Sequence, residues 1–174
     1  SDDMLHGSGT ITFINRSPDS LRTLALHLRQ NIHAEGMERT RRAEVTGGMT
    51  VEKLGFNGTD MVELQTRRDL RREGMGYVVD ATRMRVILPE AVVPGDSVTL
   101  STEWSFRIPG EDNFRMGQDG DVFYLAYWYP HLAVYDDVDG WVAELYQGDG
   151  EFYMGYADYD LSVTVTSEAG ETVA

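Results

Sequence analysis

The stretch YLAYWYPHLAVYDDVDGW, residues Tyr124–Trp141, holds two of the three tryptophans of the chain and predicts how its fold is organised. Its aromatic residues alternate with small apolar residues, which is typical of a β-strand with two different faces. Pro130 should end one strand, because proline cannot donate a ladder hydrogen bond. His131–Tyr135 then continues as a short extension, and Asp136–Gly140 forms a tight turn. The stretch therefore predicts the edge of a β-sandwich that presents a surface to another molecule.

Other segments carry the period-2 pattern of half-buried strands. Ser97–Ile108 (SVTLSTEWSFRI) alternates most cleanly, with Val98, Leu100 and Trp104 among the residues on its apolar face. Leu21–Gln30 is composed of good helix formers, but its alternation favours a strand with His27 on a solvated polar face. Further strands are predicted at Thr10–Arg16, Met49–Phe56, Met61–Thr66, Tyr77–Val79, Thr82–Leu88 (ending at Pro89) and Phe152–Thr166, with loops at Glu35–Thr46, Arg67–Gly76 and Gly110–Gly120.

These segments predict an all-β protein, an antiparallel β-sandwich of about nine to eleven strands with little or no helix. The sequence shows no alternation of strands with helices, the pattern that would predict a parallel sheet. Residues 1–9 are expected to be a disordered or artificial start, residues 10–166 a single β-sandwich domain, and residues 167–174 a polar tail. A chain of 174 residues can bury roughly 70% of its unfolded surface.

The composition excludes several classes of partner and site. A net charge of −14 argues against nucleic-acid binding, which requires clustered Lys and Arg. The absence of cysteine excludes disulfides and Cys-ligated zinc. No apolar run approaches the roughly 20 residues of a membrane span, and the opening residues lack the pattern of a signal peptide. Localisation is left open by these features.

Patterns for catalysis or metal binding are not found. His6–Gly9 does not meet the G-x-S-x-G pattern of a nucleophile elbow, and the four histidines form no H-E-x-x-H arrangement. Asp136–Gly140 and Gly148–Glu151 could hold calcium, although the EF-hand spacing is absent and solvated turns are the simpler interpretation. Glu103 and Glu144 could act as paired carboxylates if the fold brings them together. No catalytic, cofactor-binding or metal-binding residue is therefore assigned.

The aromatic residues allow two interpretations. They could form the core of the sandwich with ordinary cross-strand pairs. They could instead form an exposed platform for a sugar or another protein domain, because Trp128 and Trp141 flank turns. A free-standing carbohydrate-binding module is accordingly the alternative to the function given below.

Four segments resemble a known family when they are taken together in order. They are TITFINRSPDSLRTLALHLRQN (Thr10–Asn31), WSFRIP (Trp104–Pro109) with FRMG (Phe114–Gly117), YWYPHLAVYDDVDGW (Tyr127–Trp141) and GDGEFYMGYADYDLSVTV (Gly148–Val165). The last two are similar to a W-[YF]-P…Y-D…G-W segment and a G-E-F-Y…D-Y strand. The chain resembles the N-terminal β-domain of the aminopeptidase N-like zinc metallopeptidases, in their bacterial branch.

The resemblance implies a saddle-shaped sandwich that packs on a missing catalytic domain of the same polypeptide, which would follow the polar tail. That domain would bind zinc through H-E-x-x-H and a further glutamate and hydrolyse peptides, whereas this chain would be non-catalytic and hold no cofactor. The chain would contact the peptide substrate only indirectly, without nucleic acid or membrane insertion. The branch is compatible with an exported or periplasmic location.

The resemblance also implies where the domain surface should lie. Members of the family often use a Gln or Glu of this domain to hold the free amino terminus of the substrate, and that position falls at about Tyr127, which offers only a hydroxyl. Exposed aromatic surface predicts self-association of the isolated chain. The residues expected to line the cleft or the domain interface are Tyr127, Trp128, Tyr129, Pro130, Tyr135, Asp136 and Trp141.

Overall fold

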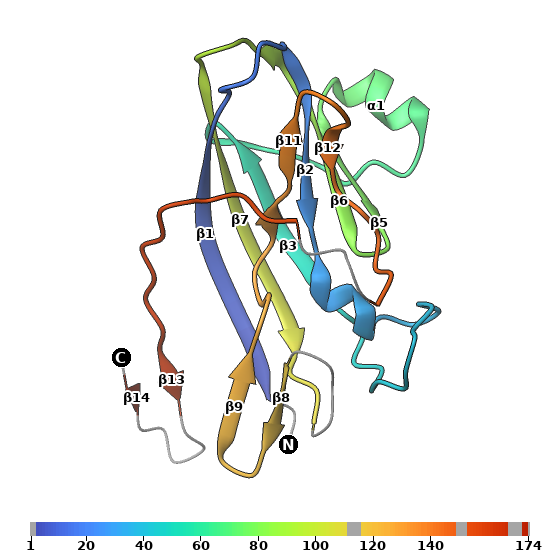
Figure 1. The fold of residues 1–174 in the computed structure, drawn as a ribbon, viewed down its shortest axis with the longest axis vertical. Coiled ribbons are helices and arrows are strands. Elements are labelled where there is room, and N and C mark those ends of the chain that lie inside the picture. The colour runs from blue at the N-terminus through green and yellow to red at the C-terminus, as the bar shows by residue number, and fades with distance from the viewer. Residues whose placement is uncertain (1–2, 111–115, 149–152, 167–171, 174) are drawn as a thin grey trace.

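The chain folds into two four-stranded antiparallel sheets (Figure 1). The computed structural model describes residues 3–110, 116–148, 153–166 and 172–173. The first sheet has the order β1 (Met4–Ile14), β7 (Ser97–Arg107), β3 (Thr50–Phe56), β4 (Thr59–Asp60). The second has the order β10 (His131–Leu132), β2 (Leu21–His27), β6 (Arg83–Val92), β5 (Gly76–Asp80). Both are antiparallel throughout, so the expected all-β sandwich is confirmed.

Three two-stranded ribbons complete the described part of the chain. They are β8 (Met116–Asp119) with β9 (Val122–Leu125), β11 (Val134–Asp136) with β12 (Gly140–Val142), and β13 (Val165–Thr166) with β14 (Thr172–Val173). In Figure 1 the ribbon β8–β9 lies below the end of β7 and at the height of the lower part of β1. The described residues form fourteen strands, more than the nine to eleven expected, because six of them are only two or three residues long.

Apolar side chains from both sheets meet in one core. Leu100 of β7 and Leu54 of β3 come from the first sheet, and Leu24 of β2 and Met84 of β6 come from the second. All four are buried. The period-2 pattern of β7 places its apolar face inward along the central strand of the first sheet, as its sequence predicts.

Strand β2 is covered on both faces, which corrects the expectation of a solvated polar face. His27 is only 2% exposed, because β10 pairs beside it and the β11–β12 ribbon lies over this side of the strand. Ala25 packs there against Ala133 and Ala143. The helical alternative for Leu21–Gln30 was wrong, since only a 3₁₀ turn, η1 (Arg29–His33), follows the strand.

Five expected boundaries need correction, and the first is the loop expected at Gly110–Gly120, where Met116–Asp119 forms β8. Strand β1 begins at Met4, so residues 4–9 are part of the sheet and not a disordered start. Strand β6 continues past Pro89 to Val92, because the register with β2 shifts between Leu21 and Thr23 and no regular ladder spans the proline.

The other two corrections concern strands that do not form. Met61–Thr66 makes a single parallel bridge, Glu63 to Tyr77, in place of a strand. In the closing segment expected at Phe152–Thr166, residues 153–164 form no ladder and only β13 is paired, while Phe152 lies outside the described residues. Its partner strand is absent from the described part of the chain, which is why the alternating pattern alone does not produce a sheet strand.

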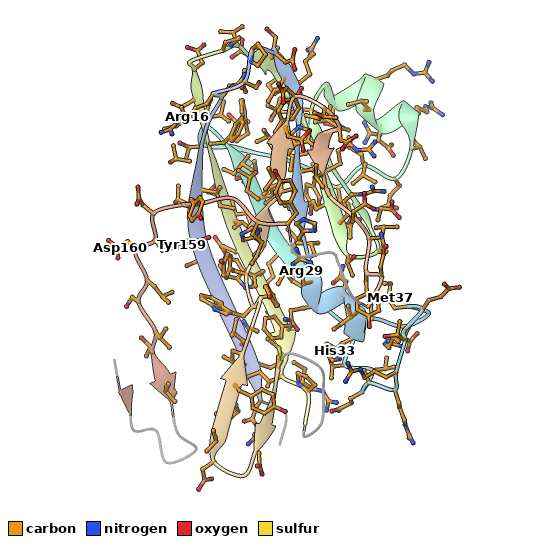
Figure 2. The ribbon with its side chains drawn as sticks, viewed as in Figure 1. Arg16, Arg29, His33, Met37, Tyr159 and Asp160 are labelled. Atoms are coloured by element: carbon orange, nitrogen blue, oxygen red, sulfur yellow. The ribbon has the colours of Figure 1, made fainter. Side chains whose placement is uncertain are left out.

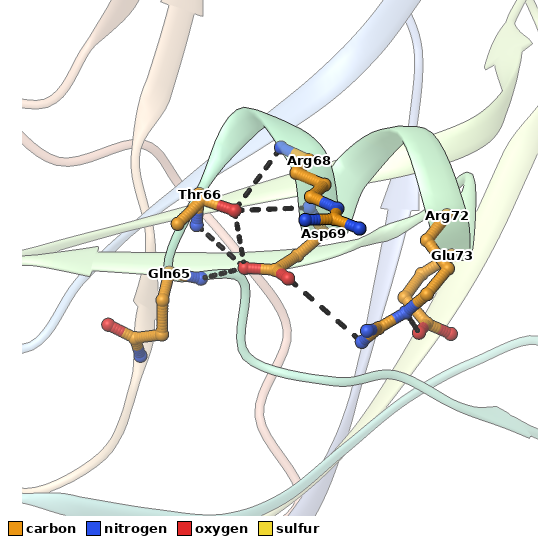
Figure 3. Close-up of polar contacts among 6 residues, drawn as sticks. All are labelled: Gln65, Thr66, Arg68, Asp69, Arg72 and Glu73. Atoms are coloured by element: carbon orange, nitrogen blue, oxygen red, sulfur yellow. Dashed lines mark hydrogen bonds and ion pairs between the residues drawn. The ribbon is translucent and has the colours of Figure 1, made fainter.

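A short helix, α1 (Arg67–Glu73), replaces part of the loop expected at Arg67–Gly76. Figure 3 shows its capping box: the Thr66 hydroxyl accepts from the amides of Arg68 and Asp69, both at 3.2 Å, and Asp69 Oδ2 accepts from the Thr66 amide at 2.8 Å. Gly74 ends the helix in the left-handed conformation. The T-x-x-D spacing was the available sequence signal.

Candidate interaction surface

Residues Ala126 and Tyr127 are held in place by the 3₁₀ turn that follows β2. Gln30 Nε2 donates to the Ala126 carbonyl at 3.0 Å and to the Tyr127 carbonyl at 3.1 Å. Arg29, labelled in Figure 2, lies 5.3 Å from the centre of the Tyr127 ring, within the range of a cation–π contact. Tyr127 has a φ of 56°, which a non-glycine residue adopts at a cost of about 1–3 kcal/mol. These contacts fix the backbone in a strained conformation.

Trp128 is half-buried and not the exposed platform that its position beside a turn suggests. Its carbonyl accepts from Trp104 Nε1 at 2.9 Å, and the two indole rings lie 6.0 Å apart. The Trp104 ring lies under β1, where it fills the space that a side chain at Gly7 would need. Trp128 therefore extends the core toward the edge of the sandwich.

Tyr129 and the two histidines continue this row of aromatic rings. The Tyr129 ring lies 5.2 Å from Trp128 and 5.9 Å from His131, and His131 lies 6.4 Å from His27 across the β10–β2 pair. Burial, with the nearby Arg29 charge, lowers the pKa of His131. Burial and then the hydrogen bond with Tyr159 at 3.4 Å raise the pKa of Tyr129. Both groups are therefore neutral at pH 7.

Pro130, Tyr135, Asp136 and Trp141 complete the expected set. Pro130 is buried before β10. Tyr135 and Trp141 face each other across the β11–β12 ribbon, with ring centres 5.3 Å apart. The Trp141 indole donates to the Thr23 carbonyl at 2.8 Å, so the ring is pinned to β2.

The acidic turn after Tyr135 is closed by hydrogen bonds between the Asp136 side chain and the backbone of the turn. Asp136 Oδ1 accepts from the amides of Val138 at 3.0 Å and Asp139 at 2.7 Å. This is the bonding that favours Asp in turns. The Tyr135 hydroxyl donates to Asp19 at 2.7 Å, and this bond raises the pKa of Tyr135.

The seven expected residues thus form two groups and not one patch. Tyr127 contacts η1 and Trp128 contacts Trp104, whereas Tyr135 and Trp141 contact the segment that contains Asp19 and Thr23. Strand β10 lies between them in the chain. The two groups are close in the sequence but pack on different parts of the sandwich.

A continuous run of exposed apolar residues lies in β9, which the sequence did not single out. Val122, Phe123, Tyr124 and Leu125 are 64%, 42%, 40% and 38% exposed. They alternate between the two faces of the β8–β9 ribbon, so both faces carry apolar side chains. The signal in the sequence was the unbroken run V-F-Y-L, which has no polar face for a solvated hairpin.

The described residues do not assemble a site for the other two hypotheses, the paired carboxylates and the metal ion. Glu103 lies in β7 of the first sheet, whereas Glu144 follows β12 beside the second sheet and accepts from Gln147 at 3.1 Å. Within the described residues, no group of three or more His, Asp or Glu side chains is placed to hold a metal ion. The acidic turn at Gly148–Glu151 lies mostly outside those residues. No helix in the described part of the chain has the length and hydropathy needed to cross a bilayer.

A comparison with protein-family models, with curated proteins and with solved structures returns no match for this chain.

Proposed function

We propose that this chain is a non-catalytic β-sandwich domain of an aminopeptidase N-like zinc metallopeptidase, which packs against the catalytic domain and lines the peptide cleft. The antiparallel sandwich agrees with the N-terminal domain that the sequence resembles. The zinc and the hydrolytic chemistry would belong to the catalytic domain, to which this chain would contribute shape and contact surface.

The observation that carries the proposal is the exposed apolar surface of β9. A solvated hairpin with apolar residues on both faces is marginal by itself, because it leaves most of its apolar area in water. Contiguous exposed apolar residues mark interaction sites in soluble proteins. Ala126 and Tyr127 directly follow β9 and are anchored by Gln30. This anchor would hold the hairpin in a fixed position for docking.

The gene beyond the codon for Ala174 tests the family assignment. The proposal expects a downstream H-E-x-x-H motif with a glutamate about twenty residues further along. A stop codon or an unrelated domain would refute it. Where the motif is present, Phe123→Ser in the full-length enzyme should raise KM for peptides, whereas Val138→Ser, at the exposed turn of β11–β12, should leave it unchanged.

A carbohydrate-binding module is kept as a second candidate because of other aromatic residues. Tyr153, Tyr156 and Tyr159 are 52%, 110% and 64% exposed, whereas Trp128 and Trp141 are packed into the sandwich. Exposed tyrosine rings can stack on sugar rings. Titration of the chain with oligosaccharides would favour this function if Tyr156→Ala abolished binding.

A further inference from the structure

The segment from Ala157 to Thr164 has the pattern of a half-buried strand, yet it has no strand partner among the described residues. Its odd-numbered positions are apolar and its even-numbered positions are polar. Tyr159, Leu161 and Val163 are 64%, 61% and 58% exposed. In Figure 2 the labelled Asp160 lies to the left of β1, where this segment turns downward toward β13. An amphipathic strand with its apolar face in water is incomplete without a sheet edge.

The fold offers one edge that matches this strand in length and chemistry. The outer edge of β1 is eleven residues long, and within the described residues no strand pairs with it. Its sequence, MLHGSGTITFI, contains no proline, lysine or acidic residue, the usual means of protecting an edge. The other outer edges are unsuitable.

Each of those edges is short, occupied or charged. Strands β4 and β10 have two residues each. Strand β5 is already bonded at Tyr77 to residues 62–64. The part of β3 beyond β4 carries Glu52, a like charge for the acidic segment, and Lys53, a residue that commonly protects a sheet edge.

If residues 157–164 pair antiparallel with β1, the apolar faces of the two strands align over eight residues, and so do their polar faces. When Ser162 lies opposite Ser8, Tyr159 meets Ile11 and Val163 meets Gly7 on the inner face. On the outer face Asp158 and Asp160 meet Thr12 and Thr10, so no acid faces another acid. Gly7 and Gly9 have the Trp104 ring beneath them, which gives Leu161 and Val163 an apolar surface to pack on.

We propose that residues 157–164 of one copy add as an antiparallel strand to the β1 edge of a second copy, and that the exchange is reciprocal. Within the described residues of each molecule, this segment and the outer edge of β1 both lack a strand partner. Two copies satisfy both edges at once, as in a two-fold dimer. The pairing leaves β9 free for docking to a catalytic domain, whereas Tyr159 of the pairing segment also contacts Tyr129, with ring centres 6.1 Å apart.

Disulfide trapping tests the arrangement, because the chain has no cysteine of its own. A mixture of Ser8→Cys and Ser162→Cys chains should form a covalent heterodimer under mild oxidation, since opposed residues bring their Cβ atoms within about 4.5–5.5 Å. Cross-linking of Ser162→Cys with itself would show pairing between two tails and overturn the proposal. A monomeric chain with both cysteines and an internal disulfide would show closure within one molecule and overturn it equally.

Sedimentation velocity supplies a measurement without cysteines. Val163→Lys should weaken the dimer roughly tenfold or more, because a charge replaces an apolar side chain in the pairing face. Ser162→Lys, on the polar face beside it, is the matched control and should weaken it by less. Higher salt should strengthen the dimer, since each copy carries a net charge of −14. A wild-type chain that stays monomeric at high concentration and high salt would refute the exchange.

Discussion

Replacing Gln30 with methionine removes two hydrogen-bond donors from the interior while nearly conserving the volume of the side chain. Gln30 is buried and donates to the carbonyls of Ala126 and Tyr127, at 3.0 and 3.1 Å. Each such bond contributes about 0.5–1.5 kcal/mol net. The loss of both should lower the free energy of unfolding by about 1–3 kcal/mol. For a domain of this size the melting temperature should fall by roughly 3–9 °C.

Urea unfolding followed by tryptophan fluorescence measures this change, and hydrogen exchange locates it. The amides of residues 126–129 should exchange faster in Gln30→Met, because Tyr127 no longer has the bond that holds its φ at 56°. Gln118→Met is the matched control, since Gln118 makes one exposed bond, to the Gly120 carbonyl at 3.0 Å. The control should change the free energy of unfolding by about 0.5 kcal/mol or less.

Equal stability of the two variants would contradict this account. It would mean that water replaces both bonds of Gln30 and that the conformation of Tyr127 is maintained by other contacts, such as the Arg29 cation–π contact. Unchanged exchange at residues 126–129 would lead to the same conclusion.

Three further changes follow from the same structure. Lowering the pH below about 6.5 should destabilise the fold, because buried His131 has a lowered pKa and the unfolded chain then binds the proton first; urea midpoints that stay constant from pH 7.5 to 5.5 would argue against it. Thr66→Ala should cost about 1 kcal/mol of unfolding free energy through loss of the N-cap of α1, measured by thermal unfolding, and no change would count against the capping box. Trp141→Phe should cost about 1–3 kcal/mol in urea unfolding, because the carbonyl of Thr23 loses its donor, whereas a neutral result would mean that water takes its place.

The sequence predicted those strands that bury one face in the core, because their apolar and polar residues alternate. Strand β7 is such an element, and its residues alternate as expected over most of its length. It did not predict that His27 is buried, because the cover comes from β10 and the β11–β12 ribbon about one hundred residues further along. Local alternation indicates one apolar face of a strand and does not show whether a distant segment covers the other.

Among the residues predicted for the candidate surface, Trp128 and Trp141 are more buried than the sequence suggested. Trp128 and Trp141 flank turns, which suggested exposure, yet their backbone carbonyl and indole N–H groups bond to Trp104 and Thr23. Such partners are distant in sequence, so no local pattern indicates them. The V-F-Y-L run was visible in the sequence, but its pairing with β8 beyond the sheets was not.

The packed residues of this region are needed for folding, whereas its exposed residues are available for binding. Trp128→Ala should destabilise the chain by about 3 kcal/mol or more, because its ring packs on Trp104 and the core. Phe123→Ser should cost less than about 1 kcal/mol, since Phe123 is 42% exposed in a ribbon outside the core. Chemical unfolding of the two variants measures both values.

The same pair of variants decides which group forms the docking surface. If β9 is the docking surface proposed above, Phe123→Ser should keep the fold and lose affinity for the proposed catalytic domain, measured by titration calorimetry. Trp128→Ala should lose stability, while the fraction that remains folded still binds. If affinity instead follows Trp128 and is indifferent to Phe123, the surface is the aromatic row of residues 127–131, and β9 has another role.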